Sequence, residues 1–129
     1  MTYTFHISEF TSKIPVYLVV ELIGNLLKNA VEAVKTQQVE KQIHLSCTEN
    51  ENEFCLGVRN RSEKIPLDEM GRFFEKGYSS KGSGRGLGLY NVKEICEKYG
   101  VDIVCDNTEI DDKNWFLIEI HIKKQTFSY

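Results

Sequence analysis

The sequence predicts an α+β fold, a two-layer sandwich in which helices cover one face of a mixed, mostly antiparallel sheet of about five strands. Two segments have apolar residues at helical spacing, short alternating segments of strand type occur in adjacent pairs, and polar turns separate the members of each pair. The 129 residues are enough for one compact core, so we expect residues 1–129 to form a single domain.

The N-terminal half is predicted to contain a strand, a long helix and a hairpin. Residues 3–7 alternate as a strand does, and Pro15 suits the first turn of a helix that continues to about residue 36 or 38. Residues 43–48 and 54–59 follow as two strands, and the polar run ENENE between them favours a turn.

The C-terminal half is predicted to add two helices and a second strand pair. A short helix over residues 67–74 precedes a glycine-rich loop over 75–86 and a full helix over 87–98, which Gly100 ends. The last two strands are residues 101–105 and 115–122, and a charged turn over residues 109–114 joins them.

Composition narrows the class of protein. The chain has no apolar run long enough to cross a membrane and no signal-peptide pattern, so we expect a soluble domain. Its net charge of −3 disfavours nucleic-acid binding, but residues 59–86 carry an excess of positive charge that suits a compact anion such as a nucleoside triphosphate. The four cysteines form no CxxC pair and lie in apolar stretches, which favours reduced core residues in a reducing cytosol over zinc ligands.

The first predicted helix has a polar stripe at the edge of its apolar face. The apolar arc consists of Leu22, Ile23, Leu26, Leu27, Ala30, Val31, Ala33 and Val34. Glu21, Asn25, Asn29 and Glu32 lie together beside this arc, and Lys28 and Lys35 are predicted to face water. An ordinary solvated helix face would show the same stripe. Two asparagines one turn apart are unfavourable in a helix, however, so they favour a functional role. Since their oxygens are suitable ligands for magnesium, the stripe is a candidate surface for magnesium and phosphate.

The run KGYSSKGSGRGLGL over residues 76–89 is the second candidate for anion binding. It follows a polar loop, not a buried strand, and lacks a GK[ST] ending, so it is neither the dinucleotide fingerprint nor a Walker loop. Its glycines allow close approach of the backbone, the helix that follows presents free N–H groups, and Lys81 and Arg85 add charge. A flexible loop that only caps a helix would have a similar sequence.

Three motifs in their order and spacing resemble a known family. NLLKNAVEA, FFEKGYSSKG and GRGLGL resemble the N, F and second glycine boxes of the ATP-binding domain of sensor histidine kinases, in the GHKL superfamily shared with gyrase and a heat-shock chaperone. The forms NAVEA and FEKGYSSKG, with no DxGxG box, look most like the peptide-pheromone quorum-sensing receptor kinases of Gram-positive bacteria. The resemblance covers residues 21–104 and implies a Bergerat-type ATP-binding fold.

The resemblance also implies roles for individual residues. Asn29 would ligate magnesium, with Asn25 and Glu21 as further candidates for the ion, and Lys81 would reach the terminal phosphates of ATP. In chain order, the ATP-binding residues that it implies are Asn25, Asn29, Asn60, Ile65, Tyr78, Ser80, Lys81, Gly84, Arg85, Gly86, Leu87, Gly88 and Leu89. We expect residues 79–85 to form a lid that becomes ordered around the phosphates.

Two departures from the family pattern concern the adenine end of the site. The usual DxGxGIP box aligns with residues 60–66, NRSEKIP, so Asn60 replaces the aspartate that binds the adenine amine, and both glycines are absent. The aromatic residue often found at the end of the N box is Ala33 here. Since a neutral amide is a weaker partner than a carboxylate, we expect modest affinity for ATP.

The superfamily offers more than one activity. In its single-domain serine kinases, which act as anti-sigma factors, a glutamate serves as general base at the position of Asn25, so that activity is poorly supported here. None of His6, His44 and His121 has the sequence context of a phosphoacceptor. We therefore expect the domain to bind Mg-ATP and to transfer phosphate to a histidine on separate dimerisation helices, with a non-catalytic nucleotide-binding module as a further alternative.

This interpretation implies a larger parent protein. The chain would be the cytoplasmic catalytic domain of a homodimeric receptor kinase in the cell membrane, monomeric by itself, and a response regulator would receive the phosphate indirectly.

Overall fold

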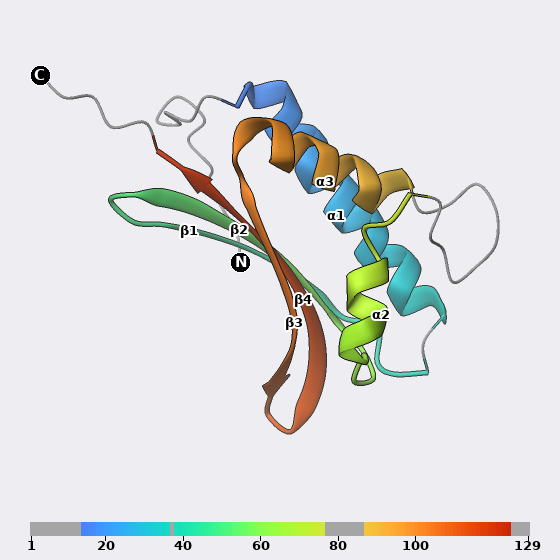
Figure 1. The fold of residues 1–129 in the computed structure, drawn as a ribbon. Coiled ribbons are helices and arrows are strands. Elements are labelled where there is room, and N and C mark those ends of the chain that lie inside the picture. The colour runs from blue at the N-terminus through green and yellow to red at the C-terminus, as the bar shows by residue number, and fades with distance from the viewer. Residues whose placement is uncertain (1–13, 37, 77–86, 125–129) are drawn as a thin grey trace, which may run out of the picture.

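The computed structural model describes residues 14–36, 38–76 and 87–124, which form a four-stranded sheet with three helices against it (Figure 1). The elements are α1 (Val16–Thr36), β1 (Ile43–Glu49), β2 (Glu53–Arg61), α2 (Leu67–Arg72), α3 (Leu87–Tyr99), β3 (Asp102–Ile110) and β4 (Lys113–Lys123). The strand order is β1-β2-β4-β3, and every pair is antiparallel. The predicted α+β class is confirmed with one strand fewer than expected, and the fifth predicted strand, residues 3–7, lies outside the described residues.

The two long helices are held to the sheet by apolar residues at helical spacing. In α1 the buried side chains are Val19, Leu22, Leu26, Ala30 and Val34. Ile23 and Leu27 are partly buried against the core, so most of the predicted arc is confirmed. Val31 is the exception: it is 40% exposed because it lies at the outer edge of the arc. In α3 the buried side chains are Leu89, Val92 and Cys96, again three to four residues apart.

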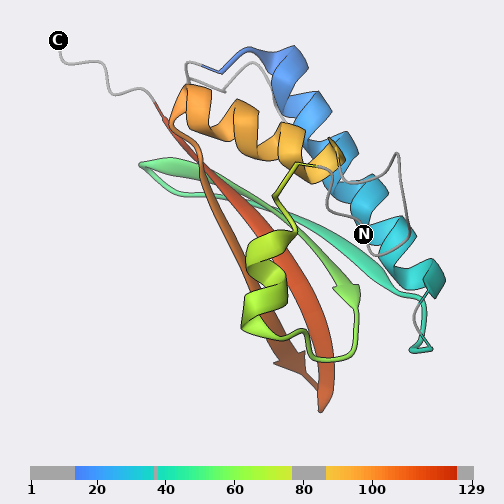
Figure 2. The ribbon, with the colours of Figure 1, turned by 45° about the vertical axis from the view of Figure 1, so that its right-hand side comes forward.

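All three helices lie on the same face of the sheet. Figures 1 and 2 show α1 and α3 side by side and running in opposite directions, with α2 over the part of the sheet that they leave uncovered. Met70 of α2 is part of the core, and Phe73 just after it meets Phe116 of β4 edge to face with ring centroids 5.5 Å apart. Among the described helices, none is long and apolar enough to cross a membrane.

The central strands alternate between a core face and an opposite face. On β2 the core face is formed by Phe54, Leu56 and Val58, and on β4 by Phe116, Ile118, Ile120 and Ile122. We call the opposite face, which no described helix covers, the open face. Because side chains alternate along a strand, Asn60 continues the core row of β2 and lies at its end, on the helix side.

The second hairpin has a shorter turn than predicted. β3 ends at Ile110 and β4 begins at Lys113, so the loop consists of Asp111 and Asp112 alone. Both have positive φ, 53° and 62°, as the tight turns between twisted strands require. The prediction over residues 109–114 was too long because the exposed charged residues Glu109 and Lys113, which lie at the strand ends, resemble loop residues. The predicted helix end at Gly100 is confirmed by its φ of 67°.

The cysteines are free thiols, but they do not share one environment. Cys96 is buried in the core, which raises the pKa of its thiol to about 12, and Cys47 and Cys105 pack against the core. Cys55 instead lies on the open face, opposite His121 in the register of β2 and β4. The prediction that all four are core residues is therefore wrong for Cys55.

Candidate functional site

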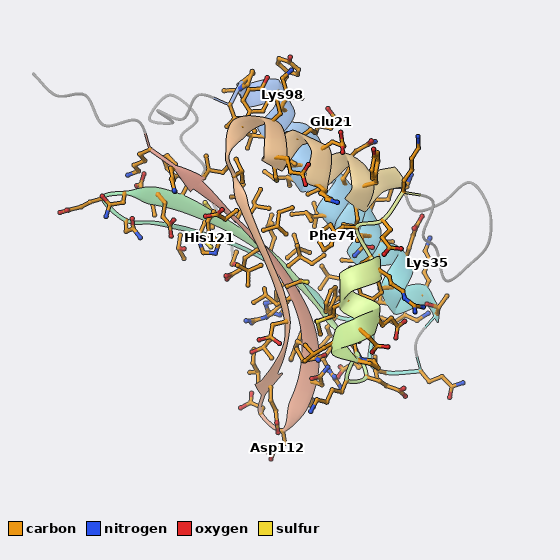
Figure 3. All side chains as sticks on the ribbon, in the orientation of Figure 1. Glu21, Lys35, Phe74, Lys98, Asp112 and His121 are labelled. Carbon is orange, nitrogen blue, oxygen red and sulfur yellow. The ribbon has the colours of Figure 1, made fainter. Side chains whose placement is uncertain are left out.

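The polar stripe of α1 lies beside the core, as predicted. Asn25, Asn29 and Glu32 are half-buried, whereas Glu21 is exposed. Lys28 and Lys35 are exposed, and Figure 3 shows Glu21 and Lys35 towards opposite ends of the helix. The two asparagine amides therefore stand where the helix surface passes from core to solvent.

The start of α3 meets this stripe. A Cβ atom placed on Gly88 would lie 3.7 Å from Oδ1 of Asn25, which is van der Waals contact. Gly88 is the second residue of α3, so its surroundings include the N–H groups that the first turn of a helix leaves without partners inside the helix. The positive end of the α3 dipole and the amide oxygen of Asn25 thus lie together.

Gly88 is not required by backbone conformation. Among the described glycines only Gly100 has positive φ, so alanine is compatible with the backbone at residue 88. Because glycine has no side chain, the position next to Asn25 leaves room for another group to approach the N-terminus of α3.

Asn60 is buried at the end of β2. Its side chain is 2% exposed, and its Nδ2 donates a hydrogen bond to the carbonyl oxygen of Arg61 at 3.1 Å. The amide nitrogen is therefore engaged by the backbone, and the amide oxygen is the end of the side chain that accepts hydrogen bonds. Ser62 and Lys64, which stand at the two glycine positions of the family box, do not have positive φ, so the backbone here does not require glycine.

Two further asparagines hold the segment after β2, and sequence reasoning missed both. Oδ1 of Asn107 accepts from the N–H of Ile65 at 2.9 Å, and its Nδ2 donates to the carbonyl oxygen of Ile65 at 2.8 Å. Nδ2 of Asn114 donates to the carbonyl oxygen of Ser62 at 3.1 Å and to Oδ1 of Asn107 at 3.3 Å. The side chains of β3 and β4 thus replace strand pairing for residues 62–65. No signal in the sequence indicated them, because Asn107 follows the predicted strand 101–105, Asn114 lies in the predicted turn, and asparagine is common in loops.

We predict that Asn107→Ala destabilises the chain by about 1–3 kcal/mol, because it leaves both backbone groups of Ile65 without these partners. Chemical denaturation followed by circular dichroism measures the change. Asn52→Ala is the matched control, since Asn52 is exposed and its side chain makes no contact with this segment. Equal stability of the two variants would show that the amide network does not hold residues 62–65.

The other predicted site residues divide into two groups. Tyr78, Ser80, Lys81, Gly84, Arg85 and Gly86 lie outside the described residues, as does the predicted lid. Leu87 begins α3, and Leu89 is 7% exposed with its side chain in the core, so its backbone N–H is the part available to a ligand.

Lys76 and Tyr90 flank the region between α2 and α3. Nζ of Lys76 lies 5.9 Å from the centroid of the Tyr90 ring, and the negative charge of Glu94 raises the pKa of the Tyr90 hydroxyl. A basic side chain therefore stands close to the start of α3.

Comparison with known proteins identifies the family of the chain. Residues 16–123 match the family model described as the GHKL domain. The chain is 38% identical over 81 residues to the sensor protein CitS of Bacillus subtilis and 37% identical over 95 residues to CitS of Halalkalibacterium halodurans. These matches cover 63% and 72% of the chain but only 15% and 18% of the two relatives.

The fold is also similar to that of a solved histidine kinase domain. The catalytic domain of histidine kinase ThkA superposes with a TM-score of 0.63 at 26% identity, covering 79% of this chain and 64% of that one. The match to the family model spans all seven helices and strands of the described structure. The chain therefore belongs to the GHKL domain family, and its fold is that of the catalytic domains of sensor histidine kinases.

Proposed function

We propose that the chain binds Mg-ATP between the polar stripe of α1 and the N-terminus of α3, and presents the terminal phosphate to a histidine on separate dimerisation helices. The observation that carries the proposal is the proximity of Asn25 to Gly88, where a Cβ atom would lie 3.7 Å from Oδ1 of Asn25. It joins amide oxygens, which suit a hard cation, to a helix N-terminus, which suits phosphate. Two features that are far apart in the sequence thus form one surface with complementary chemistry.

The residues of α1 fit a magnesium ion. Asn29 is half-buried on the same face as Asn25, one turn further along, and the exposed carboxylate of Glu21 lies one turn before Asn25. Magnesium usually keeps several waters and binds one or two protein oxygens together with substrate phosphates, so a partly open amide surface is suitable. When bound, the ion would neutralise phosphate charge. We propose Asn29 as its main ligand, with Asn25 and Glu21 as further ligands or as water-mediated contacts.

The adenine end of the site is proposed to lie at Asn60. Its orientation supports this, because its Nδ2 is engaged by the carbonyl oxygen of Arg61 and its Oδ1 is the accepting end, as an adenine amine requires. Ile65, packed against the core and held by Asn107, would provide an apolar contact nearby. Since an amide accepts less strongly than a carboxylate, the proposed affinity for ATP is modest.

Transfer to an external histidine suits the groups that are present. Asn25 stands where related serine kinases have a general base, and an amide cannot accept the proton of an attacking hydroxyl or water. The residues of this chain would therefore bind and orient ATP and stabilise its charge, while the nucleophile comes from the dimerisation helices. The same reasoning supports a parent protein that is a homodimeric, membrane-anchored sensor kinase with this domain in the cytoplasm and a response regulator downstream.

The sequence motifs also bear on the type of receptor to which the domain belongs. The motif forms NAVEA and FEKGYSSKG support a quorum-sensing receptor as the parent protein. The relatives reported above carry the name CitS, a sensor protein.

Calorimetric titration with ATP tests the proposal. We expect binding that strengthens when magnesium is present, and weaker binding of ADP in magnesium because one phosphate is lost. Absence of binding at millimolar ATP in a folded chain would contradict the proposal. It would favour an interaction module that no longer binds nucleotide.

Gly88→Ala separates the stability of α3 from its proposed role in binding. Alanine has a higher helix propensity, so we predict a chain that is more stable by up to about 1 kcal/mol. The added methyl group would occupy the space beside Asn25, so ATP binding should weaken at the same time. Thermal melts and ATP titration measure the two effects. A variant that gains stability and keeps its ATP affinity would remove Gly88 from the site. Gly71→Ala is the control, since a Cβ there meets no atom within 4 Å and Gly71 lies in α2.

A further inference from the structure

A second cluster of reactive side chains lies on the open face, away from the proposed nucleotide site. Cys55 and His121 are directly opposite each other in the register of β2 and β4. Glu119 precedes His121 by two residues, so both project from the same face of β4. Figure 3 shows His121 on the side of the sheet away from the helices, and all three side chains are half-buried.

The potential ligand atoms are arranged as they would be around one ion. Sγ of Cys55, a carboxylate oxygen of Glu119 and a ring nitrogen of His121 all lie within 4.8 Å of one another. Sγ is 3.7 Å from Nε2 of His121, and Nε2 is 3.2 Å from Oε1 of Glu119. In a tetrahedral zinc site, bond lengths of about 2.3 Å to sulfur and about 2.0 Å to nitrogen or oxygen separate the ligand atoms by roughly 3.3–3.6 Å. The observed separations are close to these values.

Glu53 supports the histidine from the other side. Its Oε1 lies 3.0 Å from Nδ1 of His121, on the same face of β2 as Cys55. A carboxylate that holds one ring nitrogen of a histidine fixes the ring and directs the other nitrogen to a metal, an arrangement common in metal sites. The structure therefore provides an orienting residue as well as three ligand atoms.

The strand opposite Glu119 leaves room for its side chain. Gly57 is its partner in the register of β2 and β4, and a Cβ at Gly57 would lie 3.3 Å from Cγ of Glu119 and 2.8 Å from Oγ of Ser46. Any side chain at position 57 would have to displace one of these neighbours. Glycine in the middle of a central strand is unfavourable, so the room that it gives to Glu119 is a specific feature of this face.

We propose that Cys55, Glu119 and His121 bind one divalent transition metal ion, zinc or a metal of similar preference, with Glu53 as the orienting residue. Thiolate and imidazole ligands favour such ions over magnesium and calcium, so this site and the oxygen-lined surface of α1 would select different metals. The alternative is a metal-free network in which Glu53, Glu119 and the Cys55 thiol all hydrogen-bond to His121, and the titration below distinguishes it from a metal site. Three protein ligands leave a fourth position for water or for a group from a partner.

Cobalt(II) titration of the 129-residue chain tests the proposal, because cobalt replaces zinc and reports thiolate ligation by a charge-transfer absorption band. We expect one equivalent to bind with this band, and zinc to displace it. Cys55→Ser should abolish the band, and His121→Gln should weaken binding at least about 100-fold through loss of a ligand. Glu53→Gln should weaken binding by about 10- to 100-fold, the usual effect of changing the partner of a metal-bound histidine.

Two control variants lie on the same sheet. Cys47→Ser changes a half-buried cysteine that packs against the core, and His44→Gln changes the other strand histidine, whose ring meets Trp115. Both should bind cobalt as the unchanged chain does. Absence of the band in the unchanged chain would overturn the proposal, as would a band that persists in Cys55→Ser or His121→Gln. If circular dichroism shows that either variant is unfolded, Glu119→Gln is tested in its place. Its metal binding should be at least about tenfold weaker than that of the unchanged chain.

Discussion

Asn29→Ala should abolish magnesium-dependent ATP binding while the fold stays intact. Asn29 is half-buried on the polar stripe, whereas the helix is held to the core by Leu26, Ala30 and other apolar residues that the substitution does not touch. A contact to a charged group is worth about 1.5–3 kcal/mol, and loss of the ion removes the phosphate contacts that it bridges. Binding should therefore weaken at least about tenfold, and more if the ion is lost completely.

Lys28→Ala is the control for this variant, because Lys28 is the neighbouring residue on α1 and is exposed. Calorimetry with ATP, with and without magnesium, compares the two variants, and circular dichroism shows that both are folded. An Asn29→Ala chain that is folded and keeps the ATP affinity of the unchanged chain would remove the polar stripe from the nucleotide site.

The second large effect concerns phosphoryl transfer. The chain alone should bind ATP but should not label itself and should hydrolyse ATP only at a trace rate. Asn25 provides no general base, and His44 and His121 lie in strands β1 and β4, where His121 is held by Glu53 and Glu119. Addition of the dimerisation helices of the parent kinase should restore transfer, because the proposed task of the domain is to orient ATP toward an external nucleophile.

Radiolabelled ATP measures this transfer, and the chemistry of the label identifies the acceptor. Label that is lost in acid and kept in base indicates phosphohistidine on the added helices, as we predict. Label that is stable in acid on an added partner protein would indicate a serine kinase instead. Rapid ATP hydrolysis by the chain alone would show that a base is present elsewhere and would contradict the role given to Asn25.

The long helices could be predicted because their sequence pattern and their packing agree. In α1 the apolar spacing that predicted the core arc is the spacing that is buried, and Gly100 ends α3 as expected. The polar stripe could be predicted for the same reason, since a helix fixes which residues share a face. The proximity of Asn25 to Gly88 could not be predicted, because it depends on how α1 and α3 pack against each other.

The remaining features depend on pairing between distant strands. Asn107 and Asn114 resemble loop residues in the sequence, and their hydrogen bonds to residues 62–65 arise only when β3 and β4 pair antiparallel beyond the end of β2. Cys55 was predicted as a core residue because its neighbours are apolar. The register of β2 and β4 instead places it opposite His121, and a shift of one residue would have sent it to the other face.

The central claim is that nucleotide binds between α1, α3 and the end of β2. Titration of the isotopically labelled chain with a non-hydrolysable ATP analogue and magnesium, followed by nuclear magnetic resonance, tests it most directly. We predict that the side-chain amide signals of Asn25, Asn29 and Asn60 shift, while those of exposed Asn52 and the indole N–H of Trp115 on the open face do not. Shifts confined to the open face, or the absence of shifts at a saturating concentration of the analogue, would contradict the account.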